Sequence, residues 1–311
     1  QDLWLGIQTP LVRMLARAVR AQSTQLRTAL RTPPRTTVAN VRARAASTKA
    51  PEMSEEHYDR VPTTYHKAWF YEKNSPYELW QLDLVCNGFS PIKDTATARL
   101  ADVGGGTGHF TKLVHDKLGL QVPSLCVDFS PAMLKQADGL NGIEALCLDG
   151  VSYARQVKDN SIDRCLLKEV VHHIPDPELP ELFGGLARGL REGGVCLIVT
   201  RPKVDIDYPF PEKAVEVWKA HQPDASIFAT SMEENGFNNV TIELKGFPVE
   251  IKLDDWTAMI KDRMWSTFAE EHFSPEELAN AIDEIEAKYP VDESGILRFE
   301  ERIVLVRGER V

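Results

Sequence analysis

Five apolar runs of strand length recur along the middle of the chain and alternate with helical segments. The runs lie at 99–103, 124–128, 143–148, 162–167 and 195–199. One helical segment begins at Ser130 with proline next to it, and another, PELPELFGGLARGLREGG, is expected to stop at the Gly193–Gly194 pair. Such alternation is typical of βαβ units, whose parallel strands form a sheet covered by helices on both faces. The sequence therefore predicts a doubly wound, mostly parallel α/β fold.

Helical patterns flank this alternating region. Residues 54–90 carry helical patterns with many aromatic side chains, and the region after Thr200 mixes strands with helices. We expect strands near 239–251 and 302–308, and helices near 226–235, 254–268 and 274–288. The last of these helices begins with a capping box formed by Ser274 and Glu277. One domain over 51–311 is predicted, with N-terminal helices over 54–90, a core over 99–200 and a helical insertion over 252–290 before the last strand.

A glycine-rich stretch, ADVGGGTGHF, follows the first apolar run. Glycine occupies Gly104, Gly105, Gly106 and Gly108. In open parallel sheets, ligands bind beyond the carboxyl ends of the strands, where the strand order reverses. A glycine loop at this place suits a nucleotide-like ligand, because the backbone can then approach the ligand closely.

Two phosphate-binding patterns fail at this loop. The dinucleotide fingerprint G-x-G-x-x-G requires a third glycine at position 109 or 111, and the chain has His109 and Thr111 there. The phosphate loop of nucleoside triphosphatases requires a Gly-Lys-Ser/Thr ending, which the chain lacks. These absences disfavour a nicotinamide-dependent oxidoreductase and a nucleoside triphosphatase.

The pattern that does fit is D-x-G-x-G-x-G, formed by Asp102, Gly104, Gly106 and Gly108. This stretch resembles the first motif of the class I S-adenosylmethionine-dependent methyltransferases. The resemblance implies that the loop carries the amino-acid end of the cofactor and that Asp102 orients its amino group. A simple tight turn between a strand and a helix is the alternative for the glycines alone.

Two further acids stand at the ends of the next two strands. Asp128 ends the second strand, twenty residues after Gly108, and a carboxylate there can accept hydrogen bonds from both ribose hydroxyls. The resemblance extends to the following Ser-Pro-x-Met-Leu and to CLDG at the third strand. It implies that Asp149 accepts from the adenine amino group and that the cofactor site includes Phe129, Met133 and Gly150.

The resemblance covers about residues 58–308 and is strongest over 99–200. It implies a seven-stranded Rossmann-like fold, S-adenosylmethionine as cofactor and a small-molecule methyl acceptor. The group that it is most similar to includes the ubiquinone and menaquinone C-methyltransferases. A catalytically silent methyltransferase-like binding module is the alternative from another class, and methylation of protein or RNA also stays open. The motifs do not identify the acceptor or the atom that is methylated.

The fourth strand ends in LLKEVVHHIPD, beside the place expected for the transferred methyl group. Lys168 and Glu169 are predicted to lie at the cofactor, and Lys168 also suggests an anionic group on the acceptor. His172 and His173 are candidates for a general base, because an ordinary imidazole titrates near neutral pH. The alternative is that both histidines only shape the loop, since positioning alone can drive methyl transfer.

Two regions are candidates for the acceptor pocket. In the aromatic N-terminal segment, Tyr65 and Tyr71 are expected to contact the ligand as part of a lid, while most of their aromatic neighbours pack in the core. In the insertion before the last strand, Trp256 and Arg263 are pocket candidates, with core packing as the alternative.

Charge is distributed unevenly along the chain. Residues 1–50 hold nine of the 36 basic residues and one of the 46 acidic residues, a net of +8, which leaves −18 for 51–311. The first 50 residues, rich in Arg, Ala, Ser and Thr, have the composition of a mitochondrial or plastid transit peptide; a nucleic-acid-binding arm or a membrane-surface helix is the alternative. The acidic remainder disfavours DNA as a partner.

The apolar stretches and the cysteine spacing argue against two further classes of protein, membrane-spanning proteins and metal or redox proteins. No apolar stretch is long enough for a transmembrane helix. The five cysteines form no metal-binding spacing, so neither a metal nor a redox site is expected. The oligomeric state does not follow from the sequence.

Overall fold

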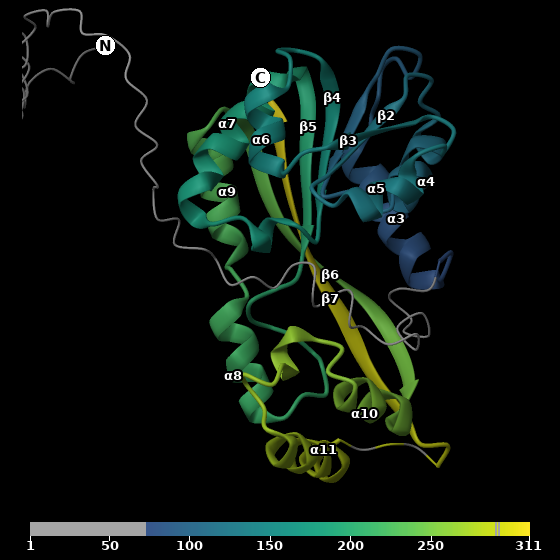
Figure 1. Cartoon of the computed structure of the whole chain (residues 1–311), viewed down its shortest axis with the longest axis vertical. Coiled ribbons are helices and arrows are strands. Elements are labelled where there is room, and N and C mark those ends of the chain that lie inside the picture. Colours follow the sequence, from purple (N-terminus) through teal and green to yellow (C-terminus); the bar gives the residue numbers. More distant parts are fainter. Residues whose placement is uncertain (1–72, 290, 292) are drawn as a thin grey trace, which may run out of the picture. The chain divides into compact units, whose positions relative to one another are not determined.

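The computed structural model describes residues 73–289, 291 and 293–311. Seven strands form one sheet in the order β3-β2-β1-β4-β5-β7-β6 (Figure 1). The strands are β1 (Leu100–Val103), β2 (Ser124–Asp128), β3 (Ile143–Cys147), β4 (Ile162–Lys168), β5 (Leu190–Thr200), β6 (Phe237–Lys252) and β7 (Ile296–Arg310). The first five pair in parallel, whereas β7 runs antiparallel to β5 and β6. The predicted seven-stranded, mostly parallel fold is confirmed.

Helices cover both faces of this sheet (Figure 1). One face carries α3 (Pro76–Phe89), α4 (His109–Leu118) and α5 (Pro131–Ala137), and the other carries α6 (Gly150–Gln156), α7 (Leu179–Gly189) and α9 (Ala225–Glu234). The middle of strand β2, residues 125–127, is continuously apolar because both faces of the strand are buried. Leu125 and Val127 pack with the second set of helices, while Cys126 packs with α5 on the opposite face.

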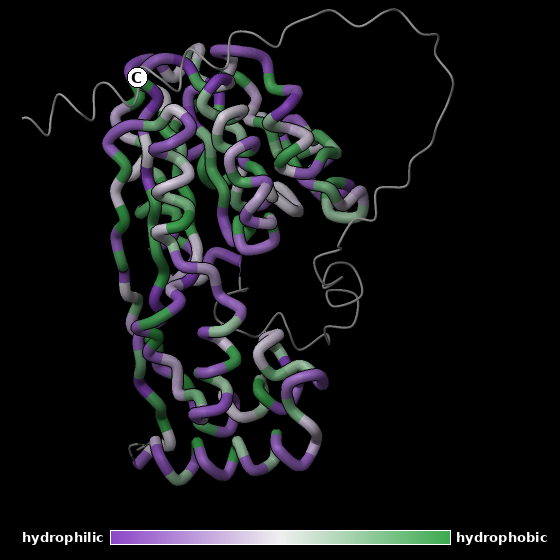
Figure 2. The backbone as a smooth tube through the Cα atoms, turned by 90° about the vertical axis from the view of Figure 1, so that its left-hand side faces the viewer, coloured by the Kyte–Doolittle hydropathy of each residue, from purple (hydrophilic) through white to green (hydrophobic). Residues whose placement is uncertain are grey.

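Strands β6 and β7 extend beyond the sheet as a long hairpin that carries a second apolar core. This core is built with α8 (Glu212–His221), α10 (Leu253–Lys261), the short 3₁₀ helix η4 (Ser266–Phe268) and α11 (Pro275–Lys288). Figure 2 shows hydrophobic segments both along the sheet strands and among these helices. The capping box predicted for the last helix is present, with Ser274 and Glu277 each accepting from the other's backbone. We call this part of the chain the hairpin lobe.

Two predicted helix ends are wrong. The helix expected to stop at Gly193–Gly194 ends at Gly189, because Leu190 is fully buried and already pairs with Ile162 of β4. The glycine pair instead lies in an irregular part of β5, where Gly193 adopts a positive φ of 74°. The helix expected over 254–268 ends at Lys261, because Arg263 adopts the left-handed conformation with φ 53°.

The strand order reverses at β1, which lies between β2 and β4. Chain segments leave the carboxyl ends of these neighbouring strands toward opposite faces of the sheet, which opens a ligand position there. After β4, the chain enters two short 3₁₀ helices, η2 (Val171–His173) and η3 (Asp176–Glu178). The predicted cofactor and catalytic residues therefore meet at this one edge of the sheet.

Some expectations fall on other parts of the chain. The leader over 1–50, most of the N-terminal helical segment, and the lid candidates Tyr65 and Tyr71 lie outside the described residues. None of the helices in the described ranges combines the length and apolarity needed to traverse a lipid bilayer.

Candidate active site

Two properties of the loop after β1 require glycine: its backbone conformation and, at Gly104, the lack of room for a side chain. Gly104 and Gly106 have φ values of 82° and 56°, which residues with side chains rarely adopt. A Cβ on Gly104 would lie 2.6 Å from Cγ2 of Val170, in the loop after β4. A Cβ on Gly106 would meet no atom within 4 Å. Gly104 is thus a packing requirement, while Gly106 exposes its backbone to open space where a ligand can approach.

Asp102 is buried at the end of β1 with half of its carboxylate unpaired. Its Oδ2 accepts a 2.6 Å hydrogen bond from the hydroxyl of Thr111, and its Oδ1 has no hydrogen-bond partner in the described part of the chain. Burial raises the pKa of Asp102 to about 6, against the opposing effect of the Thr111 bond. A buried oxygen without a donor fits the amino group of the expected cofactor, which is a cationic donor.

Asp128 joins the second strand to the glycine loop. Its Oδ2 accepts from the backbone N–H of Gly106 at 2.9 Å, and its Oδ1 accepts from that of Ser130 at 2.9 Å. Each carboxylate oxygen has two lone pairs, so both oxygens retain acceptor capacity for ribose hydroxyls. Ser130 caps α5 by accepting from Met133, and Phe129 between them is 55% exposed. An exposed phenyl ring at this position can cover an adenine face.

Asp149, just after β3, caps the N-terminus of helix α6. It is the N-cap of α6, where both of its oxygens accept from Ser152, one from the backbone and one from the hydroxyl. Burial would raise the pKa of Asp149, but the hydrogen bonds from Ser152 outweigh it and the pKa is lowered. The next residue, Gly150, packs within the helix start, where a Cβ would lie 3.1 Å from Val103. The remaining lone pairs of Asp149 are available to an adenine amino group.

Lys168 and Glu169 lie at the end of β4. The Nζ of Lys168 sits 5.0 Å from the centre of the Phe110 ring, and burial lowers its pKa although neighbouring carboxylates oppose this. Those carboxylates belong to Glu169, Asp102 and Glu78. Arg201 acts on the pKa of Lys168 in the opposite sense to these acids. The expected role of Lys168 in attracting an anionic acceptor group stays a prediction.

The two histidines follow on a single 3₁₀ turn, with ring centres 4.0 Å apart. Burial lowers the pKa of His172 to about 4 and also lowers that of His173. His172 is therefore neutral near pH 7, and its Nδ1 has no partner among the described residues. The pKa does not match the near-neutral general base that the sequence suggests for this residue.

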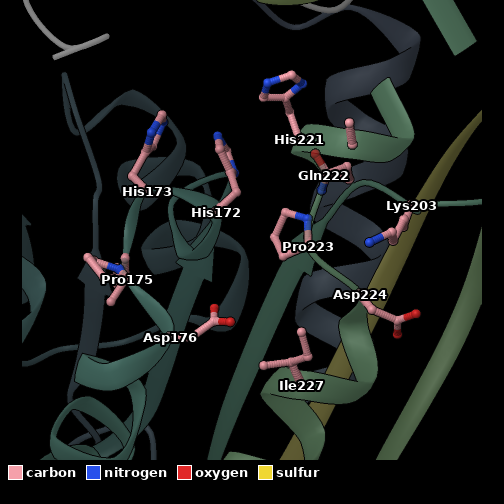
Figure 3. Close-up of a pocket in the computed structure, with 12 residues that line it drawn as sticks. His172, His173, Pro175, Asp176, Lys203, His221, Gln222, Pro223, Asp224 and Ile227 are labelled. Carbon is pink, nitrogen blue, oxygen red and sulfur yellow. The ribbon is translucent and has the colours of Figure 1, made fainter. Parts of the chain in front are cut away.

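A cavity of about 340 Å³ lies beside the histidines. Figure 3 shows His172 and His173 on one side of it and His221, Gln222 and Pro223, from the end of α8, on the other. Charged side chains of both signs, Asp176, Lys203 and Asp224, also line it. Across the described residues, no group of His, Cys, Asp and Glu is arranged to hold a metal ion.

The acceptor-pocket candidates in the hairpin lobe have structural roles. Trp256 is fully buried in the second core, and its indole N–H donates to the carbonyl of Pro209 at 2.9 Å. Arg263 donates to the carbonyl of Phe268 and so holds the turn between α10 and η4. Trp256 is a core residue and does not line a pocket, because the predicted helix packs its apolar face inward onto the hairpin.

The structure contains a buried polar network that was not predicted from the sequence. Arg201, Tyr77 and Tyr208 all contact the carboxylate of Glu301, which is fully buried on β7. One signal was present in the sequence: Glu301 stands in alternation with Phe299 and Ile303, on the apolar face of its strand. Its partners come from α3, from the end of β5 and from the loop after it, so only the fold brings them together.

Comparison with known proteins agrees with this geometry. Residues 100–194 match the family model described as a methyltransferase domain. The chain is 26% identical over 102 residues to phosphoethanolamine N-methyltransferase 1 of Triticum aestivum; the match covers 31% of this chain and 20% of that protein. The chain therefore spans about a fifth of the length of this relative.

One solved structure shows the same fold over most of this chain. The YcgJ protein of Bacillus subtilis superposes with a TM-score of 0.51 at 18% identity, covering 75% of this chain and 98% of that one. Phosphoethanolamine N-methyltransferase 2 of Haemonchus contortus, in complex with S-adenosyl-L-methionine, gives a TM-score of 0.49 at 17% identity, with 79% of this chain and 55% of that one covered. Strand order and glycine loop define a Rossmann-like fold of the class I methyltransferase type. The family match agrees with this fold: residues 100–194 resemble a methyltransferase domain.

Replacing Asp128 tests the position of the ribose. We expect Asp128→Ala to weaken S-adenosylmethionine binding by about 1.5 to 3 kcal/mol, the range for hydrogen bonds to a charged group. Asp128→Asn should be milder, because one acceptor oxygen remains. Calorimetric titration measures both, and Asp138→Ala, at an exposed acid that ends α5, is the matched control. Unchanged affinity in a folded Asp128→Ala protein would contradict this position.

The raised pKa of Asp102 predicts a pH-dependent stability. Because the folded protein holds this proton more tightly than the unfolded chain, stability is lost as pH rises from about 4 through 6. Asp102→Asn removes this contribution, so the stability of the variant relative to wild type should improve by about 2 to 3 kcal/mol between pH 4 and pH 8. Urea unfolding at the two pH values measures it. If the difference in free energy of unfolding between Asp102→Asn and wild type did not change with pH, the pKa of Asp102 would not be raised in the folded protein.

Proposed function

We propose that this protein is an S-adenosylmethionine-dependent methyltransferase that acts on a small molecule. The observation that carries the proposal is the set of three acids, Asp102, Asp128 and Asp149, at the ends of β1, β2 and β3 around one open glycine loop. Asp102 has an unpaired oxygen for an ammonium group, and Asp128 has acceptor capacity for a diol. S-adenosylmethionine presents an ammonium group at its amino-acid end and a diol on its central ribose.

The chain's residues bind and orient, and the cofactor supplies the reactive group. When bound, S-adenosylmethionine provides a methyl group whose carbon–sulfur bond breaks, the electron pair staying on sulfur, as a lone pair of the acceptor bonds to the carbon. Asp102 holds the amino-acid end, Asp128 the ribose, and Asp149 with Phe129 the adenine. The loop after β4, from Lys168 to His173, then borders the acceptor side. Holding two reactants in line can lower such a barrier by about 7 to 11 kcal/mol without any acid–base group.

A small acceptor is the better-supported class. The chain outside the first 50 residues carries a net charge of −18, which repels the phosphates of RNA. The Triticum aestivum relative is named for a small-molecule substrate, phosphoethanolamine, although the match covers only a fifth of that protein. A catalytically silent binding module is the second candidate, because no side chain at the site is obligatory for the chemistry itself.

One assay separates these two functions. Purified protein is incubated with methyl-labelled S-adenosylmethionine and a metabolite extract, and labelled products are separated by mass spectrometry. We expect a labelled small molecule and formation of S-adenosylhomocysteine, both reduced in Asp128→Ala. Cofactor binding without turnover in any extract fraction would favour the silent binding module.

The state of His172 can be measured without knowing the acceptor. Histidine carbon resonances are followed by NMR between pH 3.5 and 8, with His172→Gln to assign the signal. Because burial lowers its pKa to about 4, His172 should stay neutral throughout the range above pH 5. It would then contribute no loss of turnover between pH 8 and pH 6. A His172 signal that titrates near 6.5 would contradict this lowered pKa and would favour the general-base role.

A further inference from the structure

Arg201 joins two carboxylates at the edge of the site. Its Nη1 lies 2.5 Å from Oε1 of Glu301, and its Nε lies 3.5 Å from Oε2 of Glu169. Glu301 comes from β7 and Glu169 from the end of β4, so the guanidinium links the two sides of β5. Lys168 also interacts electrostatically with Glu169, so each carboxylate of this group has a cation nearby.

Each of these carboxylates has one oxygen that lacks a donor. The Oε1 of Glu301 accepts from Arg201, from Tyr208 at 2.8 Å and from Tyr77 at 3.4 Å, while its Oε2 has no hydrogen-bond partner within the described ranges. The same holds for Oε1 of Glu169. The side chain of Glu301 is 0% exposed. An unpaired buried carboxylate oxygen is costly, so two of them in one network call for a ligand that donates hydrogen bonds.

Glu169 is also held in a strained conformation next to the cofactor loop. Its φ is 53°, a left-handed value that is uncommon for a residue with a long side chain. The neighbouring Val170 packs against Gly104, where an added Cβ would come within 2.6 Å. Strain of this kind persists where surrounding structure enforces it, and it clusters at functional sites. Glu169 is therefore one residue away from direct contact with the loop that we assign to the cofactor.

The same network adjoins an aromatic surface. The ring of Tyr77, whose hydroxyl faces Glu301, stacks on Trp80 at 5.6 Å and meets Phe247 edge-on at 5.3 Å. Trp80 and Phe247 are both partly exposed. An apolar or aromatic ligand body can pack on these rings while a polar group reaches the carboxylates.

From this arrangement we propose that Glu169 and Glu301 form the polar end of the methyl-acceptor site and bind a hydrogen-bond-donating group, an amine or a hydroxyl, on an apolar acceptor. This inference rests on the proposed methyltransferase function and names its substrate class. Glu169 and Glu301 determine specificity, while Arg201 is a positioning residue that lies between the two carboxylates. An ionised carboxylate or phosphate on the acceptor has no hydrogen to donate to the two unpaired oxygens and would be repelled by them, so such acceptors are disfavoured.

Binding of three matched probes tests the proposal. Benzylamine, benzyl alcohol and benzoate share one ring and differ only in the polar group. Each is titrated into the full chain saturated with S-adenosylhomocysteine, and ligand-observed NMR gives the dissociation constants. We expect benzylamine or benzyl alcohol to bind at least about tenfold more tightly than benzoate. The ratio between the two donor probes then distinguishes an amine from a hydroxyl acceptor.

Variants connect this preference to the two acids. Glu169→Gln and Glu301→Gln keep the side-chain shape and should each weaken binding of the preferred donor probe by about tenfold or more. Glu300→Gln, at an exposed neighbour on β7, is the matched control and should change nothing. Because Glu169 is partly exposed, its variant tests the site even if the buried Glu301 variant unfolds.

Three outcomes would overturn the proposal. Benzoate could bind as tightly as the tighter of the two donor probes, or neither donor probe could show saturable binding. The third outcome is that the affinity of the preferred donor probe is unchanged in both glutamine variants. Failure of S-adenosylhomocysteine to bind would instead contradict the proposed function, and it is measured first, by calorimetry, in the same samples.

Discussion

The contact between Gly104 and Val170 is the constraint on which the site depends. It presses the loop after β1 against the loop after β4, where a single added Cβ would lie 2.6 Å from a side chain. These loops leave neighbouring parallel strands at the point where the strand order reverses. One loop carries the open backbone of Gly106, and the other carries Glu169. The fold thereby places the cofactor position beside the proposed acceptor position, to which β6 and β7 add Phe247 and Glu301.

Several features that lower the stability of the fold lie at the residues of the proposed site. Asp102, Glu169 and Glu301 each keep an oxygen without a donor, and burial raises the pKa of Asp102 and of Glu301. Glu169 adds backbone strain. Among the other buried polar groups, His115 is paired with Ser124 at 2.9 Å, while Tyr153 and Ser231 also have an oxygen without a partner among the described residues. Local conflicts that gather at one edge of an otherwise consistent fold are typical of ligand sites.

The three acids of the proposed cofactor site could be placed together from the sequence because each depends on local features alone. Asp102, Asp128 and Asp149 each end an apolar run, and parallel strands bring such ends together. The acceptor half could not, because Arg201 and Glu301 are a hundred residues apart and meet only through the pairing of β5 with β7. For Trp256, the sequence leaves a pocket role and core packing both open, because an aromatic helix face looks the same whether it packs on a ligand or on a core.

Hydrogen–deuterium exchange with and without S-adenosylmethionine tests the central claim most directly. If the glycine loop and the three strand ends form the cofactor site, added S-adenosylmethionine should slow amide exchange in residues 104–108, 128–133 and 149–152. The hairpin lobe around α10 and α11 should exchange as before. The account would be contradicted if saturating S-adenosylmethionine left those three segments unchanged, or if protection appeared only in the hairpin lobe.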